Sequence, residues 1–247
     1  MNDSTAHRLL DLNQIFYDQF AAQWDRSRNM PMYGFVEALP YFPAGQLDVL
    51  DVGCGNGRFS EFMSQNGRLK SYTGIDFSSG LLDQAAENFG SLPEPVSFHQ
   101  GDLRNSGFLD SFATYDLITI HAVLHHIPQK ERRLAIIQEL ATHLNENGML
   151  MTSTWQFLSS ERQRRKIVDW DTIGLAPDDV EAGDYLLTWR RGGLGYRYCC
   201  MVDKAQTAEL AAEAGLNITY QFLEDGKERN LSLYSLMSPL KKGVFET

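Results

Sequence analysis

Three aspartates follow three successive strand-like segments, and a glycine-rich loop accompanies the first of them. Asp51 ends "LDVLDV" and precedes the loop "GCGNG" at 53–57, Asp76 ends "SYTGID", and Asp102 follows "PVSFHQ". Glycines at alternate positions let the backbone turn sharply and approach a ligand closely, with a helix N-terminus beyond them. Since the carboxyl ends of parallel strands meet at one edge of a sheet, these residues predict a site for a nucleotide-like ligand.

The spacing of the glycines distinguishes between two kinds of ligand. A dinucleotide site with the pattern G-x-G-x-x-G needs glycine at position 58, which is Arg58 here. A ligand with an amino-acid end and an adenosine end matches better. In that interpretation Asp51 faces the ammonium group, Asp76 accepts hydrogen bonds from both ribose hydroxyls, and Asp102 accepts from the adenine amino group.

Two adjacent histidines follow the fourth strand-like segment and are candidates for acid–base chemistry. His125 and His126 lie in "AVLHHI", directly after "YDLITIH". An imidazole in this position could remove a proton from a methyl acceptor as a general base. A packing role for both rings remains the alternative.

A stretch between the fifth strand-like segment and the last helix alternates arginines with aromatic residues. In "DYLLTWRRGGLGYRYCC" (184–200) the candidate substrate residues are Trp189, Arg190, Arg191, Tyr196 and Arg197. Guanidinium groups can form paired hydrogen bonds with an anionic group, and aromatic rings can stack on a flat substrate. The segment 158–202 is therefore expected to form a substrate lid, and an ordinary solvated hairpin is the alternative.

The order of elements explains how these residues come together. Strand-like runs at 47–52, 71–77, 95–100, 115–121 and 148–155 alternate with helix-like segments near 57–66, 79–89 and 129–145. This alternation predicts an α/β fold with a parallel sheet covered on both faces. After the insertion, a helix near 203–214 and strands at 217–223 and 231–237 complete the sheet, while residues 1–45 predict an N-terminal helical cap.

Composition narrows the class of protein. The chain has 247 residues and a formal net charge of −10, which argues against broad electrostatic binding of nucleic acid. The insertion 158–202 nevertheless holds seven of the 22 basic residues. Cys54, Cys199 and Cys200 provide neither a disulfide framework nor zinc-site spacing, so no metal is expected. Because no apolar run is long enough for a membrane span and no secretory signal is seen, a single cytoplasmic domain is predicted.

The motifs resemble those of the class I S-adenosylmethionine-dependent methyltransferases. "DVGCGNG" resembles their first motif, "GIDF" the second, "GDL" the third and "YDLITIHAVLHHI" the fourth. The resemblance implies a Rossmann-like seven-stranded sheet whose last strand is antiparallel, S-adenosylmethionine as cofactor and S-adenosylhomocysteine as product. The residues implied to contact the cofactor are Asp51, Gly53, Cys54, Gly55, Asn56, Gly57, Asp76, Phe77, Asp102, Leu103 and His121.

The residues after the fourth strand narrow the type of methyl acceptor. Enzymes that methylate exocyclic amines of DNA bases typically have Asn or Asp, two prolines and an aromatic residue there, whereas this chain has "HAVL" at 121–124. Methylation at pyrimidine C5 needs a nucleophilic cysteine in the site, and neither Cys199 nor Cys200 has the expected context. The remaining prediction is an oxygen or nitrogen of a small anionic or aromatic metabolite.

Two other functions stay open. The chain is also similar to the tRNA wobble-uridine carboxymethyl methyltransferases in "FAAQWDRSRNMPMYGFVEAL", "AVLHHI" with "ERRLAIIQEL", "GMLMTSTWQF" and "ERNLSLYSLM". This resemblance implies tRNA as acceptor, and a carboxylate acceptor would need no general base. The third alternative is a subunit that binds the cofactor without catalysis. Whether a small activating subunit is required is left open.

Overall fold

The computed structural model describes residues 1–25 and 33–240. Residues 26–32, which belong to the N-terminal part compared with the tRNA methyltransferases, lie outside the described residues, as do residues 241–247. The described helices are α1 (Asp3–Asp25), α2 (Tyr33–Ala38), α3 (Arg58–Gln65), α4 (Ser79–Phe89), α5 (Lys130–Thr142), α6 (Glu161–Arg164) and α7 (Lys204–Glu213).

A seven-stranded sheet forms the centre of the molecule. Its strands are β1 (Leu47–Val52), β2 (Leu69–Asp76), β3 (Val96–Gln100), β4 (Tyr115–His121), β5 (Leu144–Trp155), β9 (Leu216–Glu224) and β10 (Ser232–Pro239). They lie in the order β3-β2-β1-β4-β5-β10-β9, and β10 is antiparallel to both of its neighbours. The seven-stranded Rossmann-like sheet with an antiparallel last strand is confirmed.

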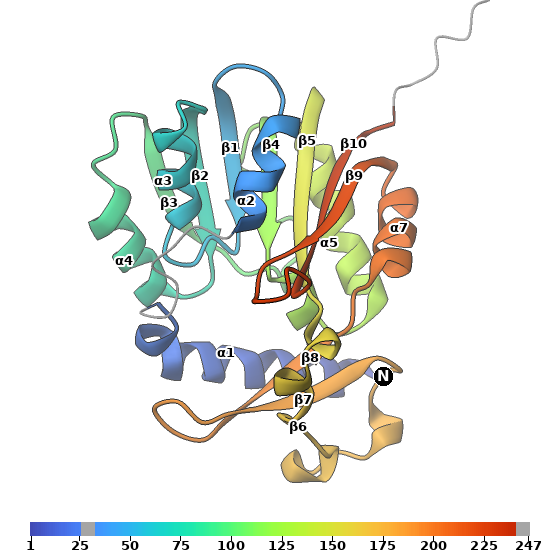
Figure 1. Ribbon diagram of the computed structural model, residues 1–247. Coiled ribbons are helices and arrows are strands. Elements are labelled where there is room, and N and C mark those ends of the chain that lie inside the picture. The colour runs from blue at the N-terminus through green and yellow to red at the C-terminus, as the bar shows by residue number, and fades with distance from the viewer. Residues whose placement is uncertain (26–32, 241–247) are drawn as a thin grey trace, which may run out of the picture.

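Helices cover both faces of this sheet because its central strands are apolar on both sides. On one face Val49 and Leu117 pack with residues of α2 and α3, including Phe35 and Phe59. On the opposite face a second apolar cluster joins β1, β4 and β5 to α5 and α7. Figure 1 shows α2 and α3 in front of the sheet and α5 behind it.

The insertion after β5 contains a second, smaller sheet. Strands β6 (Ile167–Val168), β7 (Asp184–Trp189) and β8 (Gly195–Cys200) pair antiparallel in the order β6-β7-β8. In Figure 1, α1 lies across the lower edge of the main sheet, and the small sheet lies below α1. The N-terminal helix and the insertion therefore form a layered cover over one edge of the central sheet.

The largest difference from the predicted boundaries lies between α5 and β5. The helix expected over 129–145 ends at Thr142, and β5 begins at Leu144 rather than at residue 148. Leu144 pairs with Tyr115 of β4, and the register shifts before Leu117 pairs with Met149. The polar "NENG" sequence is thus an irregularity within the strand, not the stop before it.

Among the described helices, none combines the length and the apolar composition that crossing a lipid bilayer requires.

Candidate functional site

A pocket lies between the carboxyl edge of β1, β2 and β4 and the helix α1. Its volume is about 1190 Å³, including space that is open to solvent. A ligand the size of a nucleoside with an amino-acid tail fits such a volume. The lining residues predicted as cofactor contacts are Asp51, Gly53, Cys54, Gly55, Asn56, Asp76, Phe77, Asp102, Leu103 and His121. The structure thus brings ten of the eleven predicted residues together.

Asp51 reaches the pocket from the end of β1 and is held by the neighbouring strands. Its carboxylate accepts hydrogen bonds from the hydroxyls of Tyr72 and Thr119, each at 2.7 Å. Burial raises the pKa of Asp51 to about 6, although these two hydrogen bonds act in the opposite direction. The side chain is therefore oriented before any ligand arrives, and a cationic group would favour its ionised form.

Asp76 at the end of β2 braces the glycine loop. Its two carboxylate oxygens accept hydrogen bonds from the backbone N–H groups of Gly55 and Ser78, each at 2.9 Å. Burial raises the pKa of Asp76 as well. Each carboxylate oxygen has a second lone pair, so the same side chain can still accept hydrogen bonds from a ligand.

Two glycines of the loop have different roles. Gly55 has φ +55°, and apart from its chain neighbours no described residue has an atom within 4 Å of a Cβ added there. Gly57 has φ +77° and does not line the pocket. A Cβ added there would lie 3.0 Å from the side chains of Ala85 and Phe98, so this glycine faces the interior of the fold. Gly55 thus leaves space on the pocket side, whereas Gly57 permits close packing of the loop on the fold.

Asp102 lines the pocket but is already engaged by an arginine. Arg104 donates from Nε at 2.7 Å and from its backbone N–H at 2.9 Å, and its Nη2 lies 2.6 Å from the same carboxylate. Arg104 also pairs with Asp11 of α1 at 3.0 Å. An adenine amino group would have to share Asp102 with Arg104.

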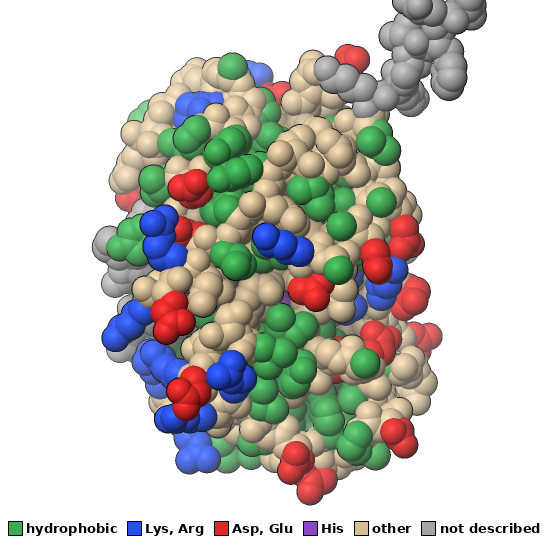
Figure 2. All heavy atoms as spheres, turned by 45° about the vertical axis from the view of Figure 1, so that its right-hand side comes forward, with side chains coloured by type: hydrophobic (Ala, Val, Ile, Leu, Met, Phe, Trp, Pro, Cys, Tyr) green, Lys and Arg blue, Asp and Glu red, His purple; other side chains and the backbone are tan. Residues whose placement is uncertain are grey.

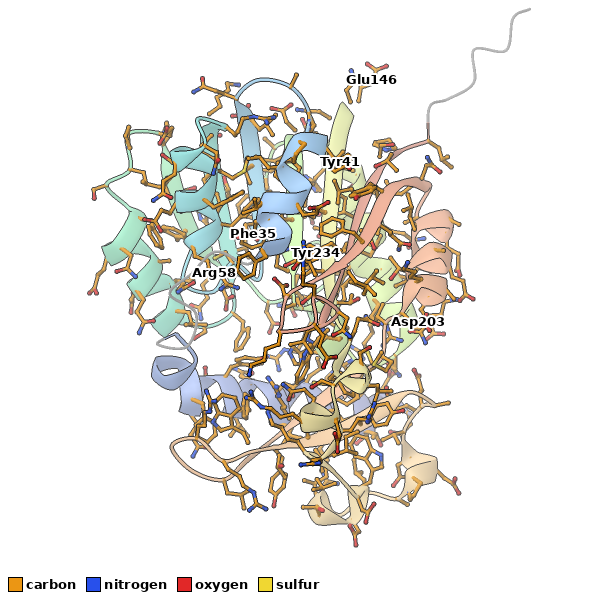
Figure 3. The ribbon with its side chains drawn as sticks, in the orientation of Figure 1. Phe35, Tyr41, Arg58, Glu146, Asp203 and Tyr234 are labelled. Carbon is orange, nitrogen blue, oxygen red and sulfur yellow. The ribbon has the colours of Figure 1, made fainter. Side chains whose placement is uncertain are left out.

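His121, at the end of β4, is a buried imidazole among aromatic rings. Its ring centroid lies 4.6 Å from that of Phe35 and 5.2 Å from that of Phe59. Neither ring nitrogen has a hydrogen-bond partner in the described part of the chain. Burial and the charge of Arg58 lower the pKa of His121 to about 3, so the ring is neutral. Figure 3 shows Phe35 and Arg58 near each other on the front of the sheet, beside this region.

The two candidate catalytic histidines are in different environments. His126 lines the pocket, and its Nε2 lies 2.7 Å from the hydroxyl of Tyr17 on α1. The other ring nitrogen, Nδ1, lies 3.0 Å from the carbonyl oxygen of Tyr198. His125 is not among the lining residues, and its Nδ1 accepts a hydrogen bond from the backbone N–H of Trp155 at 3.2 Å. Of the two histidines, the geometry therefore favours His126 as the candidate for acid–base chemistry in the pocket.

Helix α1 contributes pocket residues that were not predicted from the sequence. Leu10, Asn13, Gln14 and Tyr17 all line the pocket. Asn13 donates to the carbonyl oxygens of His126 and Tyr198, at 3.2 and 3.1 Å, and accepts from the N–H of Tyr198 at 2.8 Å. The available signal was the spacing of Asn13 and Tyr17, since polar residues four apart lie on one face of a helix.

None of the five predicted substrate residues lines the pocket. Arg190 and Arg191 are exposed, next to the turn between β7 and β8. Arg197 is buried against Phe16, Trp155 and Trp189, and the Nε1 of Trp189 donates to the carbonyl oxygen of Arg191 at 2.6 Å. The arginines of the insertion thus form two groups, one at the surface and one interior.

The residues present fit the cofactor that the motifs imply. Asp51 can offer an anion for an ammonium group, Asp76 can offer acceptors for ribose hydroxyls, and Gly55 leaves space that no described side chain fills. Apolar walls from Ile75, Leu81 and Leu103 suit a flat base. Among the described residues, no three His, Cys, Asp or Glu side chains gather in a way that could hold a metal ion.

Comparison with known proteins finds similarity to methyltransferases. Residues 49–148 match a family model described as a methyltransferase domain. A protein of Encephalitozoon cuniculi (strain GB-M1) that is named as a methyltransferase is 27% identical over 222 residues, which cover 90% of this chain and 92% of that protein.

Two further similarities concern a tRNA enzyme and a solved structure. The tRNA (carboxymethyluridine(34)-5-O)-methyltransferase of Xenopus tropicalis is 30% identical over 154 residues, which cover 61% of this chain but 22% of that protein. The crystal structure of an S-adenosylmethionine-dependent methyltransferase from Clostridium acetobutylicum ATCC 824 superposes with a TM-score of 0.64 at 16% identity, covering 90% of this chain and 98% of that one. This structural likeness establishes the fold.

Proposed function

We propose that this chain is a class I S-adenosylmethionine-dependent methyltransferase that methylates an oxygen or nitrogen atom of a small anionic or aromatic molecule. When bound, the cofactor supplies a methyl group carried on a sulfonium sulfur. The chain's residues orient the two reactants and manage the acceptor's proton. The observation that carries this proposal is the hydrogen-bonded pair Tyr17 and His126 on the pocket wall.

The hydrogen-bond partners of His126 define its tautomer. The carbonyl oxygen of Tyr198 can only accept a hydrogen bond, so Nδ1 of a neutral His126 carries the hydrogen. Nε2 is then an acceptor, and the Tyr17 hydroxyl donates to it. As Tyr17 takes a proton from an acceptor hydroxyl or ammonium group, its own proton can pass to Nε2. This arrangement supports an acceptor that must lose a proton.

The tRNA function remains a second candidate because one comparison favours it. The match to the Xenopus tropicalis enzyme covers 61% of this chain, and five arginines of the insertion are exposed, namely Arg162, Arg164, Arg165, Arg190 and Arg191. Against it, the basic residues lining the pocket are Arg58 and Arg104, and Arg104 is paired with two aspartates. A carboxylate acceptor would also leave Tyr17 and His126 without a proton to remove.

Formation of S-adenosylhomocysteine separates the candidates. The protein is incubated with S-adenosylmethionine and either a metabolite extract or a small-RNA pool, each with and without RNase. The proposal predicts turnover with the extract that RNase leaves unchanged. Turnover only with RNA, lost after RNase treatment, would support the tRNA candidate, and no turnover in any mixture would support a non-catalytic subunit or a missing activating partner.

A variant of Tyr17 tests the proton relay with the active extract fraction. Tyr17→Phe should lower kcat about 10²-fold or more at neutral pH, the usual contribution of a general base, and change its pH dependence. The affinity for S-adenosylmethionine, measured by calorimetry, should stay within about twofold of wild type, because an exchange of hydroxyl for hydrogen retains the ring's packing. Unchanged kcat would exclude the relay.

A further inference from the structure

Arg197 on β8 is buried in a box of aromatic rings. Its side chain is 7% exposed. Its Cζ lies 4.5 Å from the ring centroid of Trp155, 5.5 Å from that of Phe16 and 5.9 Å from that of Trp189. Cation–π attraction fixes the guanidinium in this box, but it leaves the N–H groups at the edge of the guanidinium without acceptors.

In the described part of the chain, no carboxylate, carbonyl or hydroxyl oxygen accepts a hydrogen bond from the side chain of Arg197, and its Nε is fully buried. A guanidinium presents five N–H donors in a planar fork. Burying such a group without acceptors is costly, so buried arginines are normally paired. The unsatisfied fork therefore indicates a site for a planar or tetrahedral oxyanion.

A second cation, Lys166, lies close enough to Arg197 for the two positive charges to repel each other. Lys166 precedes β6, and its carbonyl oxygen accepts a hydrogen bond at 2.8 Å from the N–H of Thr188 on β7, which pairs with Tyr196, the residue before Arg197 on β8. Burial, together with the positive charges of Arg197, Arg162 and Arg191, lowers the pKa of Lys166 to about 8. No described carboxylate forms an ion pair with Lys166. A bound anion would relieve this repulsion.

The aromatic box adjoins the wall of the cofactor pocket. Phe16 and Tyr17 are consecutive on α1, and Phe16 contacts Arg197 while Tyr17 lines the pocket. From the other side, the backbone N–H of Trp155 donates to His125, whose ring centroid lies 4.2 Å from that of His126. The unsatisfied guanidinium is thus one layer of side chains away from the Tyr17–His126 pair.

We propose that Arg197 and Lys166 bind an oxyanion, a carboxylate or phosphate group, of the small methyl acceptor. The identification of the bound group as part of the acceptor rests on the proposed function, whereas the site itself rests on the unsatisfied Arg197. A small anion is favoured over an RNA backbone because Arg197 is a buried residue, whereas a polyanion engages several surface cations at once.

Titration with simple anions tests the site without knowledge of the acceptor. Inorganic phosphate and benzoate are added separately to the full chain at constant ionic strength, and the Arg Nε–Hε signals are followed by NMR. We expect saturable shifts of the Arg197 signal with a Kd on the order of 1 mM for the preferred anion. The stronger of the two responses distinguishes a phosphate from a carboxylate ligand.

Matched variants locate the binding. Arg197→Met should weaken anion binding at least tenfold, as judged by calorimetry, and Lys166→Met should also weaken it, whereas Arg190→Met, the same change at an exposed arginine of the same hairpin, should leave it within twofold. If the thermal melt shows that Arg197→Met does not fold, the anion affinity of Lys166→Met decides whether the proposed site exists. No saturable shift with either anion, or undiminished binding in Arg197→Met and Lys166→Met, would overturn the proposal.

Two further measurements separate this inference from the proposed function. A single-stranded RNA oligonucleotide is titrated in the same way. If the RNA shifts the Arg197 signal and neither small anion does, the proposal that this site binds a small molecule is wrong. S-adenosylmethionine affinity is measured on the same samples and should be unaffected by Arg197→Met. Absence of cofactor-dependent turnover would contradict the proposed function, while the anion titrations, which need no cofactor, would still decide this inference.

Discussion

Asp76 has two partners at once, since its carboxylate braces the glycine loop and also faces the pocket. The N–H groups of Gly55 and Ser78 both donate to it. An asparagine at this position would place an amide N–H₂ group against one of these donors. Replacement of Asp76 therefore affects both the shape of the loop and the acceptors that it offers to ribose hydroxyls.

We expect Asp76→Ala to weaken S-adenosylmethionine binding by about 1.5–3 kcal/mol, since charge-assisted hydrogen bonds are lost. The thermal midpoint should also fall because the N–H of Gly55 loses its partner. Calorimetry and a thermal melt measure the two effects. Asp83→Asn, which removes a negative charge at an exposed position of α4, is the control and should change neither. Unchanged cofactor affinity in Asp76→Ala would exclude its role in the site.

The raised pKa of Asp51 predicts how cofactor affinity depends on pH. Ammonium binding needs the ionised carboxylate, and the pKa of Asp51 in the free protein is about 6. Affinity should be constant above pH 7 and should fall as pH decreases through 6, by up to about tenfold per unit. Calorimetric titrations between pH 5 and 8 measure this dependence, and Asp51→Asn should abolish it. A flat profile in the wild type would show that Asp51 does not face the ammonium group.

The same shift has the opposite effect on folding. Because the pKa of Asp51 is higher in the folded chain than the ordinary value of about 4, its contribution to folding stability is fully present below that ordinary value and is lost as pH rises through about 6. Asp51 thus lowers the stability of the free protein at neutral pH, and a bound cationic group would offset this effect.

The position of α1 depends on one buried amide. Asn13 makes three hydrogen bonds that join α1 to the segment containing His126 and to β8. The same part of α1 is also linked through Asp11 to Arg104, which pairs with Asp102. These contacts place Tyr17, one turn after Asn13, against His126. The cover helix is therefore part of the site.

Asn13→Ala should lower the free energy of unfolding by about 1–3 kcal/mol, because it leaves buried backbone groups of His126 and Tyr198 without partners. It should also lower kcat through the displacement of Tyr17. Urea unfolding measures the first effect. Gln19→Ala, an exposed amide on the same helix, should change stability by less than about 0.5 kcal/mol. Equal stability of the two variants would contradict the role given to Asn13.

The strands of the main sheet could be predicted from the sequence, whereas the packing of the insertion could not. The strands of the main sheet are continuous apolar runs that end in motif residues, so "LDVLDV" predicted β1 at its observed bounds. The insertion could not be predicted in the same way, because β7 and β8 are joined by the exposed turn around Gly192 and Gly193 and pack against α1, which is far away in sequence. The burial of Arg197 depends on this long-range packing, and its sequence context predicted an exposed clamp.

The distribution of charge over the whole molecule is uneven. Figure 2 shows Lys and Arg side chains gathered on one side of the lower part of the molecule, where α1 and the insertion lie, and Asp and Glu on the opposite side. A local group of cations on a chain with net charge −10 can attract small anions toward the insertion while the remainder repels polyanions. This asymmetry agrees with a small anionic acceptor.

Calorimetric titration of the wild type and of Gly55→Val with S-adenosylmethionine tests the central claim most directly. Apart from its chain neighbours, no described residue has an atom within 4 Å of a Cβ added at Gly55, so the variant should lose only about 1–2 kcal/mol of stability from its left-handed backbone and should still melt cooperatively. The account predicts saturable one-site binding to the wild type and its loss in the folded variant. Absence of saturable binding to the wild type, or undiminished binding to folded Gly55→Val, would contradict a cofactor site at this loop.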